Sequence, residues 1–357
     1  MKTIRALALV VGGVLVAACG GGGATSSPPA TSAPEPSQAA SAPASAAPSM
    51  AAEPETTTVR IVQASTPDFT QIGLIKWQQL LEERGISVEY INVEGGDIAF
   101  RTVIAGQGDY VVGGIAHLVN FVQATGEEAK LIAVDAVATD YIIVSQPDIN
   151  SAADLAGKNL GINRPGDAGD AVMRAALRGA GFDPEEANFL EIGGTSARVA
   201  ALLAGQIDAG PAHAAEAYSA VEQGLKPLIL AGEAIGPYPQ TGLMTIGATI
   251  DTKPVLTQIV VDTLVESVRW AADNKDEYIA LSREVIPDLP ESVLGPAYDV
   301  FKEIDMFGVN GGLTPSLMDS FIAIELEAGS IQGDVPPQSE WVDATFVEDY
   351  LARNGER

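Results

Sequence analysis

The sequence predicts an α/β protein with two similar lobes, each a mainly parallel sheet flanked by helices. Short apolar runs alternate with helical patterns along the chain, which is typical of parallel strands covered by helices. The chain also contains an internal repeat, because Ala-Gly-Gln-Gly-Asp at 105–109 recurs as Ala-Gly-Gln-Ile-Asp at 204–208, and an Ala-His pair follows each. A duplicated segment of this kind indicates two lobes built on one plan.

The first 18 residues have the features of an export signal. Lys2 and Arg5 give a positive start, and residues 6–18 form an apolar run that is too short to span a bilayer. The four residues that end at Cys19 resemble the bacterial lipobox, in which the signal is cut before the cysteine and the new terminus is acylated. The resemblance implies a signal peptide over residues 1–18 and a lipid anchor, such as palmitate, on Cys19. A buried free cysteine is the alternative.

The composition of residues 19–58 predicts a tether between this anchor and the folded body. They are almost wholly Gly, Ser, Ala, Pro and Thr, with Met50 as a larger apolar side chain, so they cannot bury enough surface to order themselves. The remaining chain, about 300 residues, is long enough for two domains. We expect lobe 1 over 59–143 and 241–357, and lobe 2 over 144–240.

Composition excludes several classes of function. The chain has 47 acidic and 20 basic residues and a formal charge of −27, which is unfavourable for binding a nucleic acid backbone. Cys19 is the chain's one cysteine, so the body has no disulfide, no thiolate metal site and no thiol nucleophile. We expect no cofactor.

The secondary-structure elements of the folded body are predicted from its apolar runs and from the Gly, Pro, Ser and Thr residues that separate them. A strand that ends at Ser65-Thr66-Pro67 is followed by a helix that stops before Gly85, and the same alternation continues into the second lobe. Strands are expected at 59–64, 88–93, 110–113, 131–137, 159–163 and 188–192, with helices at 72–81, 98–105, 117–124, 170–180 and 197–203. Helices are expected again at 255–274, 275–285, 292–304 and 315–328, with a last segment at 341–353. Ile259, Leu264 and Val268 lie at helical spacing and are expected in the core.

A resemblance to a known family follows from these residues. Where the second lobe begins, residues 154–161 read Asp-Leu-Ala-Gly-Lys-Asn-Leu-Gly. This segment, the two Gly-Gln-x-Asp segments and the order of elements resemble the SsuA/THI5-like (NMT1-like) solute-binding proteins of ABC importers over about 59–329. The resemblance implies a type II periplasmic-binding-protein-like clamshell, with chain crossings near 141–146 and 238–243. It also implies a monomer on the extracytoplasmic face of the membrane that passes a small molecule to an ABC permease and its ATPase.

Candidate binding residues lie where strands end. In parallel sheets the carboxyl ends of the strands face a common crevice, and the following helices present free N–H groups there. These loops are 65–69, 113–117, 135–141, 163–170, 193–196 and 210–216. The candidate ligand contacts are Ser65, Thr66, Asp68, Phe69, His117, Tyr141, Asn163, Arg164, Asp167, Thr195, His213, Glu216 and Tyr238.

The two histidines of the chain are the most specific of these candidates. His117 and His213 each follow a copy of the repeat, so we expect them at matching places that face the same space. Each can instead cap or pack at a helix start. No third ligand lies at a recognisable spacing, so a metal site is not expected.

The remaining polar and aromatic candidates each have a structural alternative. Arg164 precedes a helix in a Pro-Gly loop, which suits an anion, but it can equally pair with Asp167 or Asp170. Arg198 is a weaker candidate of the same kind. The aromatic candidates Phe69, Tyr141 and Tyr238 can stack on a flat ring or line the hinge between the lobes, and we expect at least one to touch ligand. The segment 193–196 opens a helix and does not match a phosphate-binding loop.

The expected ligand is a neutral or weakly charged heteroaromatic molecule. One arginine among acids, tyrosines and two histidines is a poor site for an inorganic anion. Within the family this favours the branch that resembles thiamine-pyrimidine or riboflavin binders, with a slight preference for riboflavin because small residues suggest a roomy cleft. An alkanesulfonate such as taurine is the alternative. A ligand-sensing receptor or a THI5-like enzyme is the alternative of another class, although the enzyme's cysteine-rich motif is absent and no catalytic residue is expected.

Overall fold

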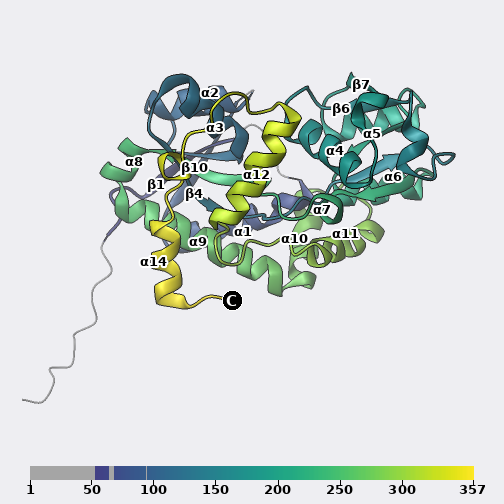
Figure 1. Ribbon diagram of the computed structural model, residues 1–357. Helices are drawn as coiled ribbons and strands as arrows, with labels where there is room; N and C mark the ends of the chain where they lie inside the picture. Colours follow the sequence, from purple (N-terminus) through teal and green to yellow (C-terminus); the bar gives the residue numbers. More distant parts are fainter. Residues whose placement is uncertain (1–52, 64–67, 94) are drawn as a thin grey trace, which may run out of the picture. The chain divides into compact units, whose positions relative to one another are not determined.

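The computed structural model describes residues 53–63, 68–93 and 95–357. Cys19, the expected signal peptide and most of the expected tether lie outside these residues, as do Ser65 and Thr66. The described chain folds into two five-stranded sheets with helices packed on them (Figure 1). This is the two-lobed α/β fold that the sequence predicts. No helix within the described ranges combines the length and the apolar character needed to cross a membrane.

The first sheet has the strand order β2-β1-β3-β10-β4. β1 pairs in parallel with β2 and β3, whereas β10 runs antiparallel between β3 and β4. In Figure 1, α2 and α3 lie on one side of these strands, and α9 and α14 lie on the other. The elements are β1 (Thr58–Gln63), α1 (Ile72–Glu83), β2 (Ser87–Asn92), α2 (Gly96–Ile104), β3 (Tyr110–Gly114), α3 (Ile115–Thr125), β4 (Ala129–Val134) and β10 (Thr241–Ile246), with a short 3-10 helix, η1 (Phe69–Gln71).

The second sheet repeats this plan in the order β7-β6-β8-β5-β9. β6 pairs in parallel with β7 and β8, and β5 runs antiparallel between β8 and β9. Each sheet therefore receives one antiparallel strand from the chain that crosses between the lobes. The elements are β5 (Ile142–Ser145), η2 (Ala152–Leu155), β6 (Asn159–Ile162), α4 (Ala168–Gly179), η3 (Pro184–Glu186), β7 (Asn188–Glu191), α5 (Thr195–Leu203), β8 (Ala209–Ala212), α6 (Ala214–Glu222), β9 (Lys226–Leu230) and α7 (Ala231–Ile235).

The C-terminal helices contact both halves. α9 packs on α1, α11 packs on α6 and α12 packs on α4. Leu264 and Val268 are buried on α9 as predicted, and Ile259 is partly buried beside them. The helices are α8 (Gly247–Thr252), α9 (Pro254–Asp273), α10 (Lys275–Val285), α11 (Glu291–Glu303), α12 (Pro315–Ala328), α13 (Gln338–Trp341) and α14 (Thr345–Asn354).

Both chain crossings differ from the prediction. The segment 141–146, expected as the first crossing, is mostly strand β5, and the crossing lies just before it at 135–141. The return crossing lies between α7 and β10 at 236–240, so it includes the start of the predicted segment 238–243, and the rest of that segment belongs to β10. The reason is that an apolar run of four to six residues can form either a linker or an inserted buried strand, and periodicity does not distinguish them.

The repeated Gly-Gln-x-Asp segments have the same structural role in both lobes. Asp109 accepts a hydrogen bond from the N–H of Arg60 at 2.8 Å, and Asp208 accepts one from the N–H of Asn159 at 2.8 Å. Each aspartate thereby ties the strand that it precedes to the neighbouring parallel strand, β3 to β1 and β8 to β6. The glycine of each segment ends a helix with a positive φ, 71° at position 106 and 65° at 205, which a residue with a Cβ adopts only at a cost.

Candidate functional site

The two histidines do not occupy matching places, contrary to the prediction. The aspartates Asp109 and Asp208 are equivalent anchors, and His117 lies eight residues after the first while His213 lies five residues after the second. The residue that matches His117, eight positions after Asp208, is Glu216. His213 instead stands at the N-cap of α6, as Gly114 does for α3. The Ala-His pairs misled the prediction because they fall at different positions relative to the helix start: His117 is the third residue of α3, and His213 is the N-cap of α6.

His117 lines a small cavity in lobe 1. The cavity has a volume of about 170 Å³ and most of its wall is apolar. The His117 ring lies against Gly96 at the start of α2, so closely that a Cβ on that glycine would be 2.3 Å from the ring's Cγ. The ring is therefore held in place by backbone. The lining residues are Gly96, Ala99, Phe100, Val111, Val112, Gly113, Gly114, His117, Thr241 and Met244.

A second, polar cavity adjoins the first and shares Gly114 and His117 with it. Its volume is about 40 Å³, and its wall combines the start of α3, the loop before α4 in lobe 2, the return crossing and α12. Both lobes and the C-terminal helices therefore meet at His117. The lining residues are Gly114, Ile115, Ala116, His117, Asn120, Gly166, Asp167, Ala168, Tyr238, Gln240, Phe321 and Glu325.

His213 lies in a cluster of carboxylates. Its Nδ1 is 2.8 Å from Oδ1 of Asp140, and its Nε2 is 3.9 Å from Oδ2 of Asp68. Tyr141 stacks on the imidazole with 4.2 Å between ring centroids and 22° between planes. Burial works to lower the pKa of His213, but the neighbouring Tyr141, Asp140 and Asp68 outweigh it and hold the pKa well above its usual range. Asp68, Tyr141 and His213 are thus brought together as predicted candidates.

Glu216 faces the same cluster from the first turn of α6. Burial raises the pKa of its carboxyl to about 7, although His213 acts in the opposite direction. One of its oxygens, Oε2, is buried and makes no hydrogen bond with a described residue. Asp135 lies near Asp68, accepts a hydrogen bond from Thr241 at 2.9 Å, and has its pKa raised to about 6 by burial. Acids from both lobes therefore gather around His213.

Thr195 and Arg198 hold the start of α5 in place. Arg198 is almost fully buried and donates to the carbonyls of Pro211 at 2.8 Å and Gly193 at 2.5 Å. Its third bond, at 3.0 Å, goes to the hydroxyl of Thr195. Three of the arginine's donors are therefore used within lobe 2, which is a structural role for both residues.

Asn163, Arg164 and Asp167 form one hydrogen-bonded group before α4. Asp167 Oδ2 accepts from Asn163 Nδ2 at 2.9 Å and from Arg164 Nε at 3.2 Å. The alternative stated for Arg164, pairing with Asp167, is what the structure shows, and 60% of its side chain is exposed. Asp167 also lines the polar cavity, and Asn163 Oδ1 is buried without a described partner.

The three aromatic candidates separate into different roles. Phe69 is buried in an aromatic core cluster with Tyr278 and Phe301, at centroid distances of 5.4 and 5.3 Å. Tyr141 is the partner of His213 already described. Tyr238 is buried, lines the polar cavity and donates its hydroxyl hydrogen bond to Glu325.

Three further residues belong to the site and were missed by the sequence analysis. Gly96 is part of a Gly-Gly pair whose counterpart is Gly-Gly at 193–194, with φ of 109° and 111° at the first glycine of each pair. The recurrence of this Gly-Gly pair in the two lobes is the sequence signal that could have identified Gly96. Asp140 and Glu325 are acids within otherwise apolar stretches, and both are fully buried. A buried acid requires a partner, which makes such a position informative.

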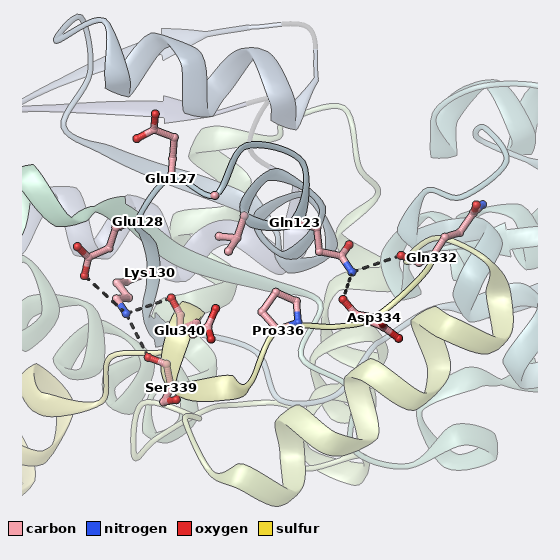
Figure 2. A pocket seen from close by; sticks show the side chains of 11 residues that line it. Gln123, Glu127, Glu128, Lys130, Gln332, Asp334, Pro336, Ser339 and Glu340 are labelled. Carbon is pink, nitrogen blue, oxygen red and sulfur yellow. Dashed lines mark hydrogen bonds and ion pairs between the residues drawn. The ribbon is translucent and has the colours of Figure 1, made fainter.

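A larger hollow of about 700 Å³ lies elsewhere, between the end of α3 and the segment before α13 (Figure 2). Its polar groups are engaged in holding that segment, because Lys130 donates to the carbonyls of Ser339 at 3.2 Å and Glu340 at 3.0 Å. Gln123 likewise donates to the carbonyl of Asp334 at 2.9 Å. We therefore place the candidate site at the His117 cavities. Within the described residues no group of three His, Cys, Asp or Glu side chains is arranged to hold a metal.

The comparisons with known proteins decide the family. The family model described as "NMT1/THI5 like" matches residues 67–278, which is more than half of the chain. The chain belongs to the NMT1/THI5 like family. A candidate binding protein of Brucella abortus (strain 2308) is 30% identical over 130 residues, covering 36% of this chain and 39% of that protein. The matched stretch thus spans about two-fifths of the curated relative.

Solved structures with low identity share the fold of this family member. The ligand-binding component of an ABC-type import system from Staphylococcus aureus, with zinc bound, has a TM-score of 0.69 at 13% identity and covers 83% of this chain and 99% of its own. The nitrate-binding protein NrtA from Synechocystis PCC 6803 has a TM-score of 0.66 at 14% identity, covering 84% and 90%. The sulfonate-binding protein SsuA from Methylobacillus flagellatus KT has 0.63 at 17%, covering 83% and 94%.

The same fold also occurs in an enzyme. The desulfurization enzyme DSZB has a TM-score of 0.60 at 15% identity and covers 83% of this chain and 99% of its own. These likenesses establish the type II periplasmic-binding-protein fold, and the fold alone does not assign a function.

Proposed function

We propose that this protein is the solute-binding component of an ABC importer, held on the extracytoplasmic face of the membrane by a lipid on Cys19. Family membership and the binding proteins among the structural neighbours support this function. In the proposed mechanism, lobe 1 (59–143 and 241–357) and lobe 2 (144–240) close on a small molecule and present it to the permease. Closure costs free energy, and the contacts that the ligand makes with both lobes offset this cost.

The proposed ligand is a single-ring nitrogen heterocycle, such as the pyrimidine precursor of thiamine. The observation that carries this choice is the apolar cavity of about 170 Å³ beneath His117. A cavity of roughly 150 Å³ is known to hold one benzene ring, so this space fits one ring and is too small for the three fused rings of a flavin. Between the two vitamins considered from the sequence, the cavity therefore favours the pyrimidine over riboflavin.

The charge around the site also favours a neutral or weakly basic ligand. Asp68, Asp140 and Glu216 surround His213, and Asp167 lines the polar cavity beside His117. Within the described residues, Arg198 is buried with its donors engaged, so it offers little to an anion. A sulfonate or nitrate would approach several carboxylates with few free donors, which is unfavourable.

An alkanesulfonate-binding protein remains the second candidate because of Arg164. Its side chain is 60% exposed just before α4 and would suit a sulfonate. A receptor that reports ligand to a membrane sensor would need the same site. A THI5-like enzyme would use a cysteine-rich motif, which this sequence does not contain.

Titration calorimetry on the purified chain tests the proposal. We expect micromolar or tighter binding of a hydroxymethyl aminopyrimidine, together with a smaller radius of gyration in solution scattering. Riboflavin, taurine and nitrate are the comparison ligands. Binding of taurine in preference to the pyrimidine would replace the proposal with the sulfonate reading, and compaction with riboflavin would show that the cavity argument is wrong.

A further inference from the structure

Asp68 and His213 face each other between the two lobes. Asp68 is the N-cap of η1, which follows β1 of the first sheet, and His213 follows β8 of the second sheet. Oδ2 of Asp68 is 3.9 Å from Nε2 of His213, and the two side chains are 28% and 11% exposed. This distance is too long for a hydrogen bond, but opposite charges at this separation attract each other where water screens them only in part.

The other polar atom of each side chain is bound within its own surroundings. Oδ1 of Asp68 accepts a hydrogen bond from the N–H of Thr70 at 2.9 Å. Nδ1 of His213 is 2.8 Å from Oδ1 of Asp140, and Oδ2 of Asp140 accepts the N–H of Ala214 at 2.8 Å. No hydrogen bond with a described residue engages Oδ2 of Asp68 or Nε2 of His213. A small closing movement would therefore let these two atoms bond directly.

Glu216 is a second group of lobe 2 that responds to Asp68. It lies in the first turn of α6, which begins next to His213. Burial raises the pKa of the Glu216 carboxyl to about 7, His213 opposes this shift, and the negative charge of Asp68 adds to it. The carboxyl is therefore neutral below about pH 7, and above that pH it is charged and repels Asp68 across the boundary between the lobes.

Both groups favour contact between the lobes at lower pH. Burial works to lower the pKa of His213, but Tyr141, Asp140 and Asp68 outweigh it, so the imidazole is still charged where Glu216 is neutral. As pH rises through about 7, Glu216 becomes charged and repels Asp68. As pH rises through the raised pKa of His213, the attraction is lost as well. The closed arrangement therefore binds protons more tightly than an open one does.

The other titratable or charged groups around the pair do not reverse this direction. They are Asp140 and Tyr141 on the first crossing, Arg198 on α5, Asp135 beside Asp68, and Tyr278 on α10. Arg198 stays charged, and its donors are bound within lobe 2. Burial holds the pKa of Tyr278 well above its usual range, so its hydroxyl stays neutral. Burial raises the pKa of Asp135 to about 6, so a comparison that begins at pH 6.5 leaves it mostly charged throughout.

We propose that Asp68, His213 and Glu216 form a proton-dependent contact between the lobes, which holds them together when the imidazole is charged and the Glu216 carboxyl is neutral. This inter-lobe contact goes beyond the proposed function, because it changes the separation of the lobes without any ligand. Its consequence is that a solute held between the lobes dissociates faster as pH rises.

Solution scattering on the full-length chain without ligand tests the inter-lobe contact. At equal ionic strength, the radius of gyration of the wild type should be larger at pH 8.5 than at pH 6.5. Asp68→Asn removes the charge on the lobe 1 side but retains the acceptor for Thr70, so most of this change should be lost. Asp251→Asn, which removes an exposed carboxylate of lobe 1 on α8, is the matched control and should retain the full change.

Glu216→Gln is a second variant, so the test does not depend on one substitution. It carries a neutral group at every pH and should also reduce the change in radius. A wild-type radius that is equal at both pH values overturns the inter-lobe contact, and so does an undiminished change in both variants. If the pyrimidine compacts the protein while the radius of the free chain is independent of pH, then the proposed function stands and this inference fails. If the radius depends on pH as expected and the pyrimidine does not bind, then the inference stands and the proposed ligand fails.

Discussion

The two histidines stand in opposite surroundings, although they belong to lobes of the same topology. His117 packs on Gly96 and lines both the apolar cavity and the polar cavity. His213 is buried among Asp140, Asp68 and Tyr141. The surroundings of His117 therefore offer space for a ring, whereas His213 of lobe 2 is surrounded by acids that come mainly from lobe 1.

The difference shows that the repeat preserves the strands and helix ends that build each lobe, and that it does not preserve the side chains at the helix starts where ligand would bind. Asp109 and Asp208 make equivalent bonds to the start of the neighbouring parallel strand, β1 or β6, and glycines end α2 and α5 in the same conformation. At the rim, equivalent helix positions carry His117 in one lobe and Glu216 in the other. Folding constrains the frame equally in both lobes, whereas a single asymmetric ligand requires different groups on its two sides.

The largest expected effect is on stability, and it distinguishes Asp109 from Asp208. Asp109 is buried and binds Arg60 through two side-chain nitrogens, at 3.1 and 2.9 Å, and Lys253 at 2.6 Å. Asp208 is half-buried and has a looser ion pair with Lys158 at 3.8 Å. We expect Asp109→Ala to lower the free energy of unfolding by about 3–5 kcal/mol and Asp208→Ala by about 1 kcal/mol, measured by urea denaturation. Equal losses would contradict the difference in burial as its cause.

The next prediction tests whether the lobe 1 cavity is the ligand site. Gly96→Ala places a Cβ 2.3 Å from the His117 ring, so we expect a loss of about 1–3 kcal/mol in stability and at least tenfold in ligand affinity. Gly113 lines the same cavity, and a Cβ there would meet no atom within 4 Å. Gly113→Ala should leave stability within about 0.5 kcal/mol but still weaken binding, because the methyl group occupies ligand space. Unchanged affinity in Gly113→Ala would place the ligand elsewhere.

Much of the fold could be predicted from sequence because it depends on local patterns. The alternation of apolar runs located β1, β2, β3, β6 and β7 and the helices between them, and the repeated aspartate segments indicated two lobes. The inserted strands β5 and β10 were read as crossings, because their partners β8, β9, β3 and β4 are distant in sequence. Pairing between distant segments leaves no periodic signal in either one.

The candidate site was only partly predictable, for a related reason. Strand-end loops identified His117, Asp167 and His213, and the expected return crossing identified Tyr238. The structure places these residues at cavities or in the acidic cluster. Phe69 was chosen by the same rule, yet it packs into an aromatic core, because a loop position does not reveal which way its side chain turns. The contribution of α12 could not be expected, since that helix reaches the site from a distant part of the chain.

A smaller effect is expected on the pH dependence of stability, and it should come from the cluster of acids around His213. Burial raises the pKa of Glu216 from 4.5 to about 7, so the folded state binds its proton more tightly than the unfolded state does. Stability from this group is then lost as pH rises from about 4.5 to about 7. The raised pKa of His213 acts in the same direction, with its stabilisation present below the ordinary pKa and lost as pH rises through the folded one. The melting temperature should therefore be higher at pH 5.5 than at pH 8.

Glu216→Gln should flatten this dependence, because the glutamine cannot titrate. Glu222→Gln, which changes an exposed glutamate on the same helix, is the matched control and should retain the wild-type slope. Melting curves recorded by circular dichroism from pH 5 to 8 measure the difference. If the melting temperature of Glu216→Gln varies with pH in parallel with that of the wild type, then the Glu216 carboxyl is not the group that titrates between pH 5 and 8.

The smallest effect is expected at Arg164. Its ion pair with Asp167 is exposed on the arginine side, and such pairs contribute about 0–1 kcal/mol, so Arg164→Ala should hardly change stability. The variant still separates the two ligand classes, because only an anion would use the guanidinium. We expect unchanged affinity for the pyrimidine. If taurine binds the wild type and loses tenfold or more in the variant, then the charge at the start of α4 outweighs the acidic rim, and lobe 2 rather than the lobe 1 cavity selects the ligand.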